Sequence, residues 1–180
     1  MICIIKKALA LLITLIISVC LFSCKDEKTF ITDVNSYSCI WDLPEFRIVE
    51  TELFPPSIDE ESCFFNCEHV VEFLLGTRWQ IELSIEFDDE SYETETKRIK
   101  ELSRGSVVFG ESEYFDIPAY ATVWNWNGCY EYALFNESTK TITYIYLQLN
   151  NKDQLTITNS YIPKNYSLTM NDVPEFTIYF

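Results

Sequence analysis

The most reactive side chains that lie close together in this sequence are those of two cysteines and the single histidine. Cys63 and Cys67 are four residues apart, and His69 follows two residues later. Thiolate and imidazole groups are preferred zinc ligands, and a cysteine beside a histidine can act as a nucleophile. This spacing matches no zinc pattern and no catalytic motif, and the sequence has no second histidine to complete a site. We therefore expect no metal and no cofactor, and a structural, partly buried position for His69.

Carboxyl groups are abundant, but they form no pattern that indicates catalysis. The chain has 28 acidic residues, so carboxyl pairs at the separation that glycoside hydrolysis requires arise by chance. The sequence has no Gly-x-Ser-x-Gly motif, and its four glycines cannot supply phosphate-binding loops. The run Asp88-Asp89-Glu90 lacks the interleaved ligands and the glycine of a calcium loop. We predict that the protein is not an enzyme; the alternative is a secreted hydrolase whose catalytic residues form no local motif.

The strongest candidate for a binding surface is aromatic. Asn127-Gly128 lies between two alternating runs, 120–126 and 129–135, and a two-residue Asn-Gly loop is typical of a tight hairpin. The register that this loop fixes places Tyr120 opposite Phe135, so one face of the hairpin carries four aromatic residues: Tyr120, Trp124, Trp126 and Phe135. Such a face can stack against a sugar ring or a partner's side chain. The alternative, which apolar faces more often follow, is that a helix covers it as core.

Four cysteines outside the N-terminal segment permit two disulfide bonds if the chain is exported: Cys39, Cys63, Cys67 and Cys129. Four cysteines can pair in three ways, and the sequence alone does not choose between them. The alternative is that these residues are buried free thiols, which pack as small apolar side chains.

The N-terminal segment has the pattern of an export signal. Lys6 and Lys7 precede an apolar stretch of 15 residues, Ala8 to Phe22, whereas a membrane-spanning helix needs roughly 20. The stretch closes on Leu21-Phe22-Ser23-Cys24, which resembles the lipobox of bacterial lipoproteins. The resemblance implies cleavage before Cys24 and transfer of a diacylglyceryl group to its sulfur, and two acyl chains suffice for stable anchoring. The alternatives are a spanning helix and an ordinary secretory signal.

This interpretation divides the chain into a cleaved signal peptide (1–23), a lipidated cysteine with a polar tether (24–36) and a single domain (37–180). It places the protein outside the cytoplasm, anchored to the cell membrane. Residues 1–23 hold two of the 13 basic residues and none of the 28 acidic ones, so the mature chain carries a net charge of −17. That charge argues against nucleic acid as a partner. We predict a non-catalytic binding or envelope-associated module that recognises a basic protein or a glycan.

Hydrophobic periodicity predicts a β-rich domain. We expect strands at residues 46–54, 67–75, 79–87, 120–126, 129–135, 141–149 and 155–161, with an edge strand in the tail from 166 to 180. Gly76-Thr77-Arg78 is expected to form a hairpin turn. In the run 79–87 the apolar residues form one face, and the face that carries Gln80 and Glu82 is expected to meet water.

One segment has the period and the charge order of a helix. Residues 92–102 have acids early and basic residues late, which is the order that a helix dipole favours. Glu93 and Lys97 are spaced for a salt bridge, and Gly105 lies where a C-cap glycine belongs. The predicted fold class is α+β: an antiparallel β-sheet meander with one α-helix, at about residues 92–103, packed on it.

Four stretches of the mature domain resemble small uncharacterised lipoproteins of Gram-positive gut bacteria: 85–102, 117–135, 142–149 and 161–166. The resemblance covers roughly half of the mature chain and implies an envelope with one membrane. It brings no activity and no functional residue with it.

Overall fold

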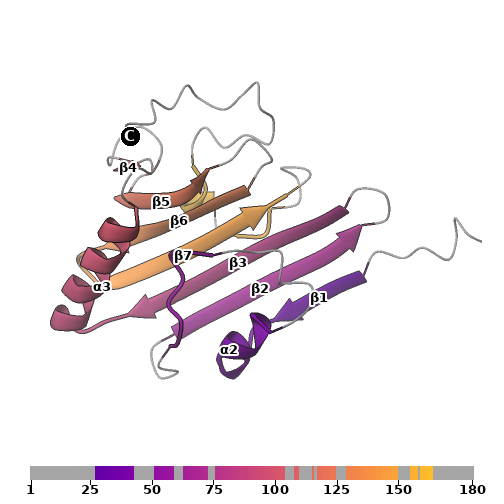
Figure 1. Ribbon diagram of the computed structural model, residues 1–180, viewed down its shortest axis with the longest axis horizontal. Helices are drawn as coiled ribbons and strands as arrows, with labels where there is room; N and C mark the ends of the chain where they lie inside the picture. Colours follow the sequence, from indigo (N-terminus) through magenta and orange to yellow (C-terminus); the bar gives the residue numbers. More distant parts are fainter. Residues whose placement is uncertain are drawn as a thin grey trace, which may run out of the picture.

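Figure 1 shows the computed structural model of the chain, which describes residues 27–42, 51–58, 63–72, 76–103, 108–109, 115, 117–124, 129–149, 155–157 and 159–163. These residues form a seven-stranded antiparallel sheet in the order β1-β2-β3-β7-β6-β5-β4. The strands are β1 (Glu27–Ile31), β2 (Cys63–Glu72), β3 (Gly76–Glu86), β4 (Val108–Phe109), β5 (Ala119–Trp124), β6 (Cys129–Asn136) and β7 (Thr141–Gln148). The helices are η1 (Val34–Ser36), α2 (Tyr37–Ile40), α3 (Asp89–Leu102) and η5 (Asn159–Tyr161). The predicted α+β class is confirmed.

The sheet consists of two meanders joined in its centre. Strands β1 to β3 form the first, strands β4 to β7 form the second, and they join where β3 pairs with β7. Helix α3 follows β3 directly and stands at one end of the sheet, while β1 starts at the opposite end (Figure 1). Among the residues that the structure describes, no helix has the length and apolar character needed to cross a membrane.

The two faces of the sheet have separate cores. The first, which we call the helix face, packs under α2 and α3 and includes Trp79, Leu83, Ile99 and Tyr144. The second, which we call the tail face, packs against residues near the C-terminal end of the described chain and includes Tyr132, Leu147 and Ile157. Burial on both sides explains why the central strands are apolar at nearly every position: in β7 all six interior residues are buried.

Strand β3 confirms the strand predicted at residues 79–87. The face of this strand that was expected to meet water is, however, buried. Ile81 and Leu83 are fully buried, as expected. Gln80 and Glu82 were expected to meet water, and they are 2% and 8% exposed. For Gln80 the reason is a crossing segment, because the Thr156 backbone N–H donates a 2.8 Å hydrogen bond to its Oε1. The tail face of this strand is therefore covered.

Helix α3 confirms the predicted helix and begins three residues earlier. Asp88 caps it by accepting a 2.7 Å hydrogen bond from the Ser91 backbone N–H, which satisfies one of the unpaired donors of the first turn. The predicted Glu93–Lys97 salt bridge is absent among the described residues. Gly105 lies outside the described residues.

Four predicted segments differ from the structure. Residues 27–31, predicted as tether, form β1, so the folded part begins ten residues before the predicted start at 37. Residues 76–78, predicted as a turn, begin β3. Residues 51–54 are not a strand, and 46–50 lie outside the described residues, as do the predicted signal peptide and the tail strand. Residues 155–157 and 159–161 are coil and 3-10 helix, because β7 already has neighbours on both sides and offers no free edge to a following strand.

Candidate functional site

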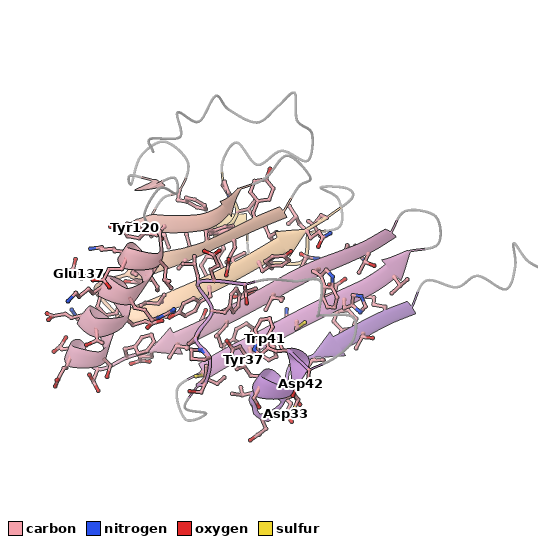
Figure 2. All side chains as sticks on the ribbon, viewed as in Figure 1. Asp33, Tyr37, Trp41, Asp42, Tyr120 and Glu137 are labelled. Atoms are coloured by element: carbon pink, nitrogen blue, oxygen red, sulfur yellow. The ribbon has the colours of Figure 1, made fainter. Side chains whose placement is uncertain are left out.

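The site that the structure favours is a cleft of about 530 Å³ between α3 and the neighbouring ends of β5 and β6. We call it the aromatic cleft. Two of the predicted aromatic residues line it, together with residues of α3 and of the turn after β6. Its lining residues are Tyr92, Glu93, Thr96, Lys97, Lys100, Pro118, Tyr120, Phe135 and Glu137. Figure 2 shows Tyr120 and Glu137 beside α3, at the same end of the sheet.

Tyr120 and Phe135 form the aromatic wall of this cleft. Their ring centroids are 5.1 Å apart and the rings are perpendicular, which is a favourable edge-to-face geometry. Phe135 is buried in the core of the helix face, whereas Tyr120 packs against that core and stays partly exposed. Phe135 is therefore part of the core, as the second alternative predicted, whereas part of Tyr120 stays accessible, and its role in binding stays a prediction.

The register of the β5–β6 hairpin corrects the rest of the predicted aromatic face. Tyr120 pairs with Ala133 instead of Phe135, and a bulge lies between Ala121 and Val123. Beyond the bulge Trp124 pairs with Tyr130, which belongs to the core of the tail face. The backbone therefore does not support one shared face for all four aromatic residues. The side chain of Trp124 and all of Trp126 lie outside the described residues.

The charges around the aromatic cleft are balanced. Glu93, Lys97, Lys100 and Glu137 are all exposed, and they contribute two acids and two bases. The Lys100 ammonium lies 5.5 Å from the centre of the Tyr120 ring, within the range of a cation–π contact. Burial and then the negative charge of Glu137 raise the pKa of Tyr92, so its phenol stays protonated at neutral pH.

A second cleft of about 530 Å³ lies along α3 and is lined by Arg98, Glu95, Pro55, Pro56 and Phe87, among others. We call it the arginine cleft. The Arg98 side chain donates hydrogen bonds of 2.6 and 2.7 Å to the Glu95 carboxylate and one of 2.5 Å to the Leu53 carbonyl. The Tyr144 hydroxyl donates a further 2.5 Å bond to Glu95. These polar groups are therefore engaged in holding the loop 51–58 on the helix face.

The buried carboxylate of Glu131 holds the same loop, and the sequence reasoning missed it. Glu131 on β6 is fully buried and accepts hydrogen bonds of 2.8 to 3.0 Å from the backbone N–H groups of Glu52 and Leu53. A buried carboxylate needs such partners, since an unpaired charge in the interior is costly. The signal available in the sequence was a single acid in the apolar run 129–135.

The cysteines and His69 do not assemble into a site among the described residues, and no group of three potential metal ligands occurs there. His69 lies on a strand, β2, as predicted, but it is buried instead of partly buried, 7% exposed, and it stacks on Trp79 with ring centroids 3.6 Å apart. Cys39 is an exposed free thiol and Cys67 a buried one. Cys63 and Cys67 are four residues apart on one strand, about 13 Å, which is too far for a disulfide with each other. The side chain of Cys129 lies outside the described residues, so a disulfide that includes it stays a prediction.

Comparisons with known proteins add no family to this geometry. No protein-family model matches the chain, and neither a curated protein nor a solved structure matches it. The resemblance of Leu21–Cys24 to a lipobox and that of the mature domain to gut lipoproteins stay predictions. The function must therefore be argued from the site itself.

Proposed function

We propose that this protein is a lipid-anchored, extracytoplasmic, non-catalytic binding module, and that its aromatic cleft binds a sugar ring of a glycan. The observation that carries the proposal is the wall formed by Tyr120 and Phe135 beside four exposed charged side chains. Binding sites for small molecules combine an apolar or aromatic surface with a few polar groups that fix orientation. The cleft has both features and the volume for such a ligand.

The local charge favours a glycan over a basic protein at this position. The mature chain has a net charge of −17, which would attract a basic partner to its surface as a whole. The aromatic cleft does not share this excess of negative charge, because two lysines lie beside its two glutamates. A neutral ligand with many hydroxyl groups can use all four of these side chains, since carboxylates accept hydrogen bonds and ammonium groups donate them. Lys100 is exposed, so its side chain can change rotamer and open the Tyr120 ring to the ligand.

A glycan array probed with the full-length, detergent-solubilised protein tests this proposal. We expect binding to a neutral oligosaccharide that Tyr120→Leu weakens about tenfold, a loss of roughly 1.4 kcal/mol in binding free energy. The control is Phe64→Leu, which changes an exposed aromatic side chain on β2, outside the cleft. Binding that Tyr120→Leu leaves unchanged, or a chain that binds only basic proteins, would contradict the proposal.

A further inference from the structure

The start of β1 restricts how far the domain can lie from a bilayer that holds Cys24. Glu27 is the first residue of β1, and only Lys25 and Asp26 separate it from Cys24. An extended chain spans at most about 3.6 Å per residue, so the Glu27 Cα lies within roughly 11 Å of the Cys24 Cα. With a lipid on Cys24, one corner of the sheet must therefore lie at the membrane surface.

The aromatic cleft lies at the opposite corner of the sheet. Glu27 pairs with Val71 near the end of β2, whereas the cleft adjoins the end of β6 that pairs with the start of β7. Strand β1 is also the outermost strand, and five strand positions separate it from β5. At about 4.8 Å per position, this places the cleft roughly 24 Å across the sheet from the anchor, besides its displacement along the strands.

The corner beside Cys24 exposes apolar side chains on both faces of the sheet. Phe30 on β1 is 56% exposed and points to the tail face, as does its pairing partner Glu68. Val71, which pairs with Glu27, is 41% exposed on the other face. The Lys28 ammonium lies 4.3 Å from the centre of the Phe30 ring and 2.9 Å from Glu68 Oε1. We call Lys28, Phe30 and Val71 the anchor corner.

These side chains match the chemistry of a lipid headgroup region. Aromatic and aliphatic groups enter the boundary between headgroups and acyl chains. Apolar side chains on both faces suit a corner that enters the bilayer edge-on. A sheet that lay flat would use one face only, and the net charge of the chain would oppose its approach to anionic lipids.

We infer that the anchor corner rests in the headgroup region of the bilayer that holds Cys24, and that the aromatic cleft therefore faces away from the membrane. This orientation rests on the lipid anchor of the proposed function. It makes the cleft accessible to glycans beyond the membrane surface, although the link between lipid and domain has only two residues.

Tryptophan quenching by brominated lipids tests the orientation. The probes are the full-length variants Phe30→Trp and Phe64→Trp, purified from membranes and reconstituted into phosphatidylcholine vesicles with brominated acyl chains. Phe64 is the matched control, because it is 55% exposed on the same face but lies at the far end of β2. The signal of the four native tryptophans is subtracted with the wild-type protein.

We expect the vesicles to quench about half of the fluorescence added at position 30, since interfacial side chains lie roughly 5–10 Å deep, and none of that added at position 64. Equal quenching at both positions would mean that the sheet lies flat, and no quenching at either would mean that the corner stands clear of the lipid; each result overturns the inference alone. Mass spectrometry of the same preparation detects the diacylglyceryl group. An unmodified Cys24 would instead overturn the anchored function, and the orientation with it.

Discussion

The two clefts along α3 have the same volume but use their polar side chains in opposite ways. In the arginine cleft, Arg98 and Glu95 bond to each other and to the rest of the fold. In the aromatic cleft, the side chains of Glu93, Lys97 and Glu137 form no hydrogen bond or ion pair with another described residue. Polar groups that are already satisfied stabilise the fold, whereas exposed ones without partners remain available to a ligand. The comparison therefore indicates a structural role for the arginine cleft and is consistent with the binding role that we propose for the aromatic cleft.

The largest expected effect concerns the loop under the arginine cleft. Glu131→Ala removes the acceptor of the Glu52 and Leu53 backbone N–H groups and leaves the buried Leu53 donor and the partly buried Glu52 donor unsatisfied. We expect the free energy of unfolding to fall by about 3–5 kcal/mol, measured by urea denaturation. Glu137→Ala, which removes an exposed carboxylate six residues further along, should change it by less than about 0.5 kcal/mol. Similar losses from the two variants would remove the distinction between satisfied and available carboxylates.

A second pair of variants compares the two clefts directly on α3. Arg98→Met breaks the hydrogen bonds to Glu95 and to the Leu53 carbonyl, and we expect a loss of about 2 kcal/mol in unfolding free energy. The neighbouring Lys97→Met should cost less than about 0.5 kcal/mol, because Lys97 is exposed. If Lys97→Met proved as destabilising as Arg98→Met, the aromatic cleft would also be a structural element.

The smallest expected effect is a difference in unfolding free energy between variants of two buried tyrosines. Tyr144→Phe removes a hydrogen bond to the Glu95 carboxylate and should cost about 1.5 kcal/mol at neutral pH, against about 0.5 kcal/mol or less for Tyr92→Phe. Burial and the charge of Glu95 raise the pKa of Tyr144 well above 10.0. The contribution of Tyr144 to the free energy of unfolding is therefore complete below pH 10. It is lost as the pH rises above 10, since in that range the phenol ionises in the unfolded state but not in the folded state.

The pH dependence of that difference provides the check. The gap between wild type and Tyr144→Phe should narrow when denaturation is repeated above pH 10. A gap that stays constant would show that Tyr144 ionises equally in both states and that the Glu95 network is not sealed from solvent.

Local patterns predicted the elements well where one period dominated. The alternation in residues 79–87 and the charge order in 92–102 located β3 and α3, because short-range packing and capping decide these elements. The predictions were wrong where contacts between residues that are distant in the sequence determine the structure. A bulge between Ala121 and Val123 shifted the hairpin register, and no local pattern marks it. Gln80 looked solvent-facing because its partner Thr156 lies 76 residues away.

The candidate site shows the same division. Tyr120 and Phe135 could be selected from the sequence, because aromatic residues in two alternating runs around a hairpin turn are visible in the local pattern. The residues of α3 that complete the cleft were not predicted, since the local sequence does not indicate over which strands a helix will lie. Glu131 was missed because its role depends on Glu52 and Leu53, from the other half of the chain.

The pairing of β3 with β7 has a consequence for how the chain folds. Its partners are far apart in sequence: Glu86 pairs with Thr141 and Trp79 with Gln148, separations of 55 and 69 residues. Such non-local contacts close late and slow folding. As the chain is synthesised from its N-terminus, β3 completes the first meander yet keeps one unpaired edge until β7 emerges. Open strand edges recruit other chains, so aggregation before that moment is the hazard that this topology creates.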